Sequence, residues 1–155
     1  KKSWYVFFFQ LPWLPERMLS ARGAQAVGRA FSDMAVDKNR FPAAVTDEYR
    51  RTASEPGALK AMINYYRAAM RAGAKAMNPE PGTVDIPTLM IWGEEDTALG
   101  KATTAGTEQY VKDLTLRYLP GVSHWVQQEA PEKVNTMIEA WLTGAPVPLE
   151  GEILR

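Results

Sequence analysis

The stretch IPTLMIWGEED, residues 86–96, decides the fold of this chain. Its nearly continuous apolar run predicts a parallel strand over 86–92 that is buried on both faces. Pro87 is tolerated because it lies near the beginning of the strand. The run ends in three acids, Glu94, Glu95 and Asp96. Parallel sheets place their functional sites at the carboxyl ends of the strands, so these acids are candidates for a site.

A second short strand is predicted over 115–119, and His124, the only histidine of the chain, follows it in the stretch LPGVSHW. A carboxylate after one strand and a histidine after the next give the chain order of the acid and base in an α/β-hydrolase. Such a histidine needs a carboxylate to fix its tautomer. We favour Asp96 over Glu94 and Glu95 because the loop must first turn after Gly93.

The spacing of apolar residues predicts helices in both halves of the chain. We expect them over 16–34, from an N-cap at Thr46, from Pro56 to a stop at Gly73, over 101–114, and from Pro131 to a stop at Gly144. The predicted buried stripes comprise Leu59, Met62, Ile63, Tyr66 and Met70 in one helix, and Val134, Met137, Ile138, Trp141 and Leu142 in the last. Tyr65 is turned away from its stripe. We expect the tail from Ala145 to be extended or mobile.

The composition divides the chain into a helical part, 1–77, a linker, 78–85, and a second part, 86–155. The second part alternates strand and helix, which predicts an α/β fold with right-handed parallel crossovers. Two strands cannot cover their own edges and faces. We therefore expect the sheet to be incomplete in this chain, with its other strands supplied by upstream sequence or by another polypeptide.

Composition excludes several classes of function. The formal net charge is zero, so the chain lacks the basic footprint of a nucleic-acid or anionic-membrane binder. No cysteine and a single histidine exclude thiolate and imidazole-rich metal sites. The longest strongly apolar run, Trp4 to Phe9, is too short to cross a bilayer.

Two kinds of catalytic residue need separate consideration. A nucleophile elbow has glycines two residues either side of the nucleophile, and no two glycines here are four apart, so we expect the chain alone to hydrolyse nothing. Ser123 is adjacent to His124 and has no sensible attack geometry. Tyr5 and Tyr66 could donate hydrogen bonds to an oxygen that becomes an alkoxide. Taken alone, their apolar surroundings favour simple core packing.

Five segments in order resemble soluble epoxide hydrolases of the α/β-hydrolase superfamily: WYVFFFQLPWLPE at 4–16, EPGAL at 55–59, INYYR at 63–67, WGEED at 92–96 and SHW at 123–125. The resemblance implies an α/β-hydrolase fold, with 1–77 as a helical cap (lid) domain and 86–155 as the C-terminal part of the core. It implies an enzyme that opens small apolar epoxides to vicinal diols.

The resemblance also implies residue roles. Tyr5 and Tyr66 bind and protonate the epoxide oxygen, Asp96 is the triad acid, and His124 activates the water that hydrolyses an aspartyl ester. The nucleophilic aspartate belongs to upstream sequence. We expect Trp4, Phe9 and Trp125 to bind the substrate, no cofactor to be required, and the protein to be cytoplasmic.

Two alternatives stay open. Haloacetate dehalogenases also resemble this chain, but they carry a His-Trp pair where this chain has Trp4 and Tyr5. Tyr5 therefore favours an epoxide hydrolase over a dehalogenase. A non-catalytic binding protein with an α/β-hydrolase-like fold is the other alternative. The residue at the upstream elbow separates them, and a serine there would instead indicate an esterase.

Overall fold

A computed structural model describes residues 4–77 and 82–153, and it divides the chain into two compact units. The first unit comprises Lys1–Asp33 and Phe41–Pro81, and the second comprises Met34–Arg40 and Gly82–Arg155. Residues 78–81 of the predicted linker lie outside the described residues. Within the remainder of that linker, Val84 forms an isolated parallel bridge with Val111.

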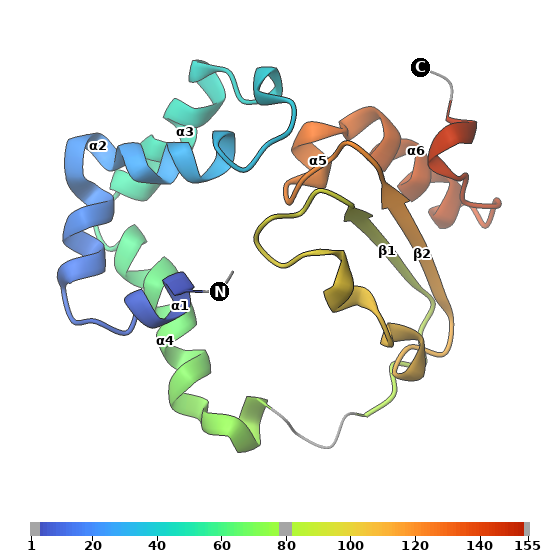
Figure 1. Ribbon diagram of the computed structural model, residues 1–155, viewed down its shortest axis with the longest axis horizontal. Coiled ribbons are helices and arrows are strands. Elements are labelled where there is room, and N and C mark those ends of the chain that lie inside the picture. Colours follow the sequence, from blue (N-terminus) through green and yellow to red (C-terminus); the bar gives the residue numbers. More distant parts are fainter. Residues whose placement is uncertain (1–3, 78–81, 154–155) are drawn as a thin grey trace. The chain divides into compact units, whose positions relative to one another are not determined.

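The first unit is helical (Figure 1). Its elements are α1, Trp4–Phe8, α2, Leu14–Ser32, α3, Ala43–Ser54, and α4, Ala58–Met77. The helical geometry of α2 is interrupted between Ala21 and Ala24, where Gly23 has a φ of 63°. Arg50 of α3 donates to the Gly23 carbonyl at this break, at 2.9 Å. A small core of Ala24, Ala53 and Leu59 therefore joins α2, α3 and α4.

Three expectations for these helices are wrong. Helix α3 begins at Ala43, and the Thr46 hydroxyl donates back to the Ala43 carbonyl inside the helix instead of acting as an N-cap. Helix α4 begins after Pro56 and continues through Gly73 to Met77, so Gly73 does not end it. Met62 and Met70 are exposed, at 45% and 38%.

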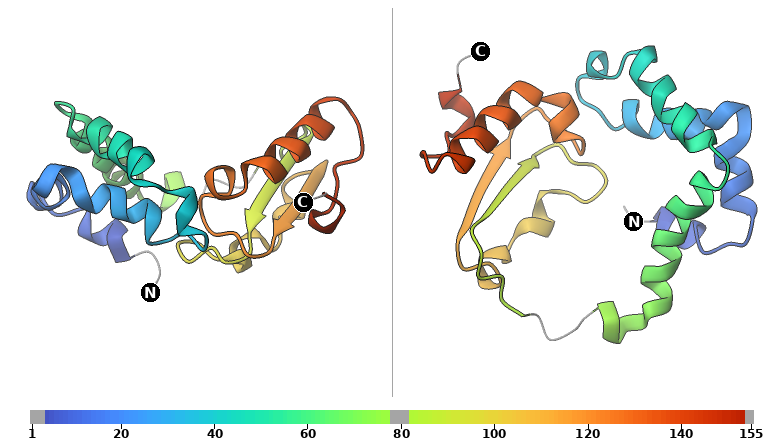
Figure 2. Two further views of the ribbon diagram at one scale, coloured as in Figure 1. Left: turned by 90° about the horizontal axis from the view of Figure 1, so that it is seen from above. Right: turned by 180° about the vertical axis from the view of Figure 1, so that it is seen from behind.

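The second unit is built on a pair of parallel strands, as predicted. Strand β1, Thr88–Gly93, pairs with β2, Leu114–Leu119, and the register places Gly93 opposite Leu119 at the carboxyl ends. Helices α5, Val126–Glu129, and α6, Pro131–Leu142, follow β2. Helix α6 lies against the strand pair (Figures 1 and 2).

The core of this unit lies between the strands, α6 and the segment that follows α6. Its buried members are Leu119, Val122, Ala130, Val134, Met137 and Val147. The predicted stripe of α6 is only partly correct, because Ile138 and Leu142 are 39% and 71% exposed. Thr143 and Gly144 end the helix as expected, with Gly144 at a φ of 72°.

One further prediction for the second unit is wrong, and a second, for the tail, is only partly correct. Residues 101–114 do not form one helix: two short 3-10 helices, η2, Lys101–Thr104, and η3, Thr107–Gln109, flank Gly106, whose φ of 86° interrupts the helical backbone. The tail after Ala145 is ordered against β2. Arg117 donates to the carbonyls of Val147 and Pro148, at 2.6 and 3.0 Å, and a further 3-10 helix, η4, spans Glu150–Glu152.

One more segment belongs to the second unit, although in the sequence it stands between two helices of the first unit. This strap, Met34–Arg40, connects α2 to α3 in the chain and contains η1, Lys38–Arg40. Arg40 pairs with Glu132 of α6 at 3.0 Å, and the Gln128 side chain donates to the Arg40 carbonyl at 3.2 Å.

Candidate active site

The two strands end side by side, so the loops that follow them start from the same edge. The acid loop, Gly93–Leu99, and the histidine loop, Pro120–Trp125, are joined by backbone hydrogen bonds. The amides of Glu94 and Glu95 donate to the carbonyls of Leu119 and Val122, each at 3.1 Å. The parallel register therefore fixes the two loops relative to each other before any side chain is considered.

Gly93 lets these loops approach closely. A Cβ at this position would lie 2.1 Å from the Ser123 carbonyl oxygen and 2.4 Å from that of Val122. Both atoms belong to the backbone and cannot rotate away, so only glycine fits without moving the histidine loop.

Asp96 and His124 meet across this junction. The His124 Nδ1 lies 2.9 Å from Asp96 Oδ2, while Asp96 Oδ1 accepts the amides of Ala98 and Leu99 at 2.8 and 2.9 Å. The Asp96 side chain is 3% exposed and that of His124 is 27% exposed. The structure thus brings together the acid and base that the sequence paired.

The electrostatics of the pair set the orientation of the imidazole. Burial raises the pKa of Asp96, but hydrogen bonds from His124 and from the Leu99 and Ala98 amides outweigh it and hold the pKa below its ordinary value. An ionised carboxylate only accepts hydrogen bonds, so Nδ1 carries the proton. The Nε2 lone pair of a neutral His124 is then available to take a proton from water.

One aromatic residue and two further acids lie close to this pair in the sequence. Trp125 packs edge-on against the His124 ring, with centroids 4.7 Å apart. Glu94 forms an ion pair with Lys101, and Glu95 is exposed, so neither carboxylate competes with Asp96 for the hydrogen bond to His124. No group of histidine, cysteine or acidic residues within the described ranges could hold a metal ion.

Tyr5 and Tyr66 lie in contact in the first unit. Their rings are perpendicular, with centroids 5.8 Å apart, and Phe9 packs against both of them at 5.8 and 4.9 Å. Burial, followed by the proximity of Tyr5 and Tyr65, raises the pKa of Tyr66. Its hydroxyl therefore stays protonated at neutral pH and remains a donor. Trp4, by contrast, is 66% exposed and packs on Phe8.

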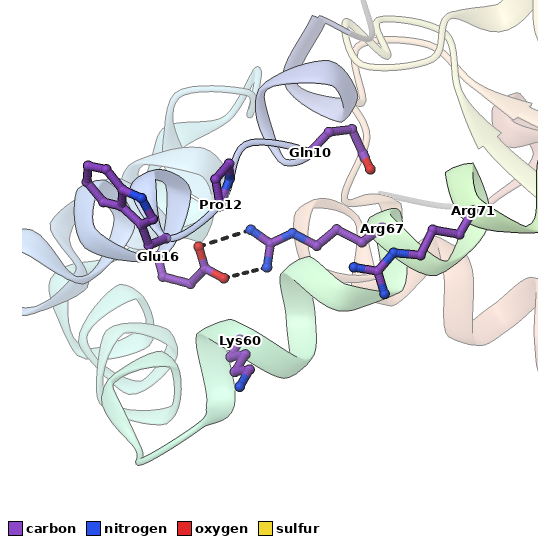
Figure 3. Close-up of a pocket in the computed structure, with 7 residues that line it drawn as sticks. Gln10, Pro12, Glu16, Lys60, Arg67 and Arg71 are labelled. Atoms are coloured by element: carbon purple, nitrogen blue, oxygen red, sulfur yellow. Dashed lines mark hydrogen bonds and ion pairs between the residues drawn. The ribbon is translucent and has the colours of Figure 1, made fainter.

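Arg67 holds the aromatic segment in place, and the apolar pattern of α4 did not reveal it. Its guanidinium donates to the carbonyls of Phe9 and Leu11, at 2.9 and 2.7 Å, and to both carboxylate oxygens of Glu16 (Figure 3). Arg67 is only 9% exposed. With Leu59 and Ile63, it forms a buried row at spacings of four, the one sequence signal that could have identified it.

The Glu16–Arg67 pair lies at a surface pocket of about 470 Å³ (Figure 3). Neither Tyr5 nor Tyr66 lines it; its residues are Gln10, Pro12, Trp13, Glu16, Lys60, Arg67 and Arg71. The pocket of Figure 3 is therefore separate from the tyrosine pair, and its arginine serves that pair by anchoring the chain that follows α1.

Several known proteins are similar to this chain. It is 37% identical to AB hydrolase superfamily protein YfhM of Bacillus subtilis over 145 residues, which are 91% of the chain and 48% of that protein. It is 35% identical to Epoxide hydrolase 3 of Mus musculus over 146 residues, covering 91% of the chain and 38% of that protein. The chain thus spans about half the length, or less, of the curated relatives that it matches. No protein-family profile matches it.

Solved structures are also similar to this chain. An epoxide hydrolase variant from Bacillus megaterium, crystallised with its naphthyloxy-propane diol product, superposes with a TM-score of 0.77 and 25% identity. The match covers 92% of this chain and 51% of that one. In the described part of the chain, no helix is long and apolar enough to cross a membrane.

The first prediction concerns Gly93. Replacing it in Gly93→Ala should push the histidine loop away and lengthen the 2.9 Å contact between His124 Nδ1 and Asp96 Oδ2, because the added Cβ meets fixed backbone oxygens. A crystal structure of the variant measures this distance directly. Gly82→Ala is the matched control, since nothing lies within 4 Å of its added Cβ. An unchanged pair in Gly93→Ala would show that the loop adjusts at no cost to the site.

The second prediction concerns Glu16. Its hydrogen bond with Arg67 lowers the pKa of Glu16, so the bond stabilises the fold above the unfolded-state pKa and is lost as pH falls through the lower folded-state pKa. Glu16→Gln should lower the free energy of unfolding at neutral pH, and its deficit should shrink as pH falls below about 4.5. Urea unfolding between pH 3 and pH 7 tests this. Glu48→Gln, at an ion pair that is mostly exposed, should change little; a deficit for Glu16→Gln that does not vary with pH would contradict the assignment.

Proposed function

We propose that this chain, a homologue of the epoxide hydrolases in the α/β-hydrolase superfamily with part of that fold, supplies the acid, the base and the cap of an epoxide hydrolase. In this proposal residues 1–77 are the cap and 86–155 belong to the core. The observation that carries it is the hydrogen bond between His124 Nδ1 and Asp96 Oδ2, at the carboxyl ends of two adjacent parallel strands.

The reaction has two steps. In the first, a carboxylate from polypeptide outside these 155 residues attacks an epoxide carbon, the carbon–oxygen bond of the ring breaks, and an alkyl ester forms. In the second, His124 takes a proton from water through Nε2, the resulting hydroxide attacks the ester carbonyl, and the alkoxide that leaves takes this proton back from His124 to give the diol. Asp96 stabilises the imidazolium that forms in this step. The carboxylic acid freed by hydrolysis returns a proton to the group that protonated the ring oxygen in the first step, so every proton is accounted for and the proposal needs no cofactor.

The tyrosines serve the first step. Ring opening leaves an alkoxide, a strongly basic leaving group that needs a proton or a strong donor as its charge develops. Tyr5 and Tyr66 are in ring contact, and burial keeps the Tyr66 phenol protonated. A halide leaves as a stable anion and has no such need, so the tyrosine pair favours the epoxide hydrolase over the dehalogenase.

Aromatic side chains are the proposed substrate contacts. Phe9 packs against both tyrosines and Trp125 packs on His124, so both lie next to proposed reacting groups. Trp4 lies one residue before Tyr5 and offers an exposed indole. Apolar faces around a few polar groups suit apolar, aryl-substituted epoxides. The similar Bacillus megaterium enzyme, bound to an aryloxy diol, agrees with this substrate class.

The third prediction separates the two steps. In the protein that carries the proposed nucleophile, His124→Ala should form the ester and hydrolyse it at least about 10²-fold more slowly, because the general base is lost. Mass spectrometry of the variant with substrate should show a covalent adduct of the substrate's mass. Gln127→Ala, at an exposed position nearby, should turn over normally. Diol formation by His124→Ala at the parent rate would contradict the assignment of the base.

The fourth prediction concerns the hydroxyls. Tyr5→Phe and Tyr66→Phe keep the ring packing but remove a donor, and each should lower the rate of diol formation on the order of 10²-fold, by analogy with loss of an oxyanion-hole donor. Tyr65→Phe is the matched control, because Tyr65 is 76% exposed on the same helix.

A haloacetate should be assayed alongside the epoxide. Equal epoxide activity in all three tyrosine variants would refute the role of the pair. Halide release by the parent without diol formation would identify a dehalogenase, and binding without either product would identify a non-catalytic protein.

A further inference from the structure

A second buried carboxylate lies beside the histidine loop and has no part in the reaction as proposed. Glu129, the last residue of α5, is 5% exposed. An acid is rarely buried to this extent unless its oxygens are satisfied by donors. The sequence pattern did not reveal Glu129, because it stands beside the buried Ala130 and in the same turn as the partly buried Val126.

The two oxygens of Glu129 hold two different segments. Oε2 accepts both the amide of Ser123, at 3.1 Å, and its hydroxyl. Oε1 accepts the amides of Val36 and Asp37, at 2.8 and 2.9 Å. Ser123 is fully buried and directly precedes His124. One carboxylate therefore joins the histidine loop to the strap.

All the partners of Glu129 are donors, which determines the residue type required here. A carboxylate presents acceptors only, so it can satisfy backbone amides on both sides at once. A glutamine of the same shape would direct an N–H at either the strap amides or Ser123, and one side would lose its hydrogen bonds.

The histidine loop is thus held from two directions. The acid loop supports it through Gly93 and through the hydrogen bond from the Glu95 amide to Val122. Glu129 holds it from the other side, at the residue next to His124. The strap supplies half of the donors to Glu129, and it is continuous in the chain with α2 and α3.

We propose that Glu129 is a positioning residue for the reaction: it fixes Ser123, and thereby the orientation of His124, and it links that orientation to the position of the strap. This inference rests on the proposed function for its kinetic consequence. Glu129 touches no reacting atom, and its influence passes through Ser123 to His124. A displacement of the base by about 1 Å is enough to cost on the order of 10²-fold in rate.

The fifth prediction tests this role with Glu129→Gln and the milder Ser123→Ala, which removes only the hydroxyl donor. In single-turnover experiments on the protein that carries the proposed nucleophile, Glu129→Gln should form the ester with the parent's amplitude and rate. It should then hydrolyse the ester on the order of 10- to 100-fold more slowly. Ser123→Ala should slow the same step by a smaller factor. Glu139→Gln, at an exposed position of α6, is the matched control and should match the parent.

A purely structural role would give a different result. Loss of folded protein would reduce the amplitude of ester formation in proportion to overall activity, which would overturn the inference. Hydrolysis at the parent rate in both Glu129→Gln and Ser123→Ala would also overturn it. If Glu129→Gln fails to fold, Ser123→Ala alone decides by the same two readouts.

Crystal structures provide a readout that does not depend on activity. The distance from His124 Nδ1 to Asp96 Oδ2, 2.9 Å in the parent, should lengthen in Glu129→Gln and stay unchanged in Glu139→Gln. If the parent forms no ester, the proposed function fails, whereas a displaced His124 in Glu129→Gln still supports the positioning role. If the parent forms diol and His124 stays in place in the variant, the positioning role alone fails.

Discussion

The close backbone contact at Gly93 is the constraint on which the second unit depends. Parallel pairing of β1 with β2 aligns Gly93 with Leu119, so the acid loop and the histidine loop leave the sheet at the same level. The absence of a side chain at Gly93 then lets the carbonyls of Val122 and Ser123 pack directly onto it. Asp96 and His124 meet because the backbone has already been brought together, and their hydrogen bond completes that arrangement.

Each unit also uses a buried, charged side chain to satisfy the backbone of an irregular segment. Arg67 donates to the carbonyls that follow α1, and Glu129 accepts from the amides of the strap and of Ser123. Loop backbone that leaves water needs such partners, since it has no ladder or helix to supply them. The arginine guanidinium only donates hydrogen bonds, so it suits carbonyls that lack a partner. A carboxylate only accepts them, so it suits amides that lack a partner.

The errors of the sequence interpretation have two origins. Residues 101–114 have weak helical periodicity, and Gly106 with its positive φ divides them into two short turns. The segment after Ala145 lacks any pattern of its own, yet Arg117 captures its carbonyls and Val147 enters the core. Thr46 looked like an N-cap, but α3 begins three residues earlier, after Pro42. Contacts from a distant part of the chain thus decided the structure of the tail, whereas local backbone geometry at Gly106 and Pro42 decided the other two cases.

By itself, the sequence determined the two parallel strands, the final helix from Pro131, and the pairing of Asp96 with His124, because a buried apolar run and the order of acid and base are local signals. The tertiary structure alone decided which polar residues are buried. Arg67 and Glu129 occupy positions where the pattern favours either an apolar or an exposed side chain, and their partners come from segments that only the tertiary structure packs around them. It also decided the contact between Tyr5 and Tyr66, since the 60 positions between them say nothing of distance until Arg67 ties the segment after α1 to α4.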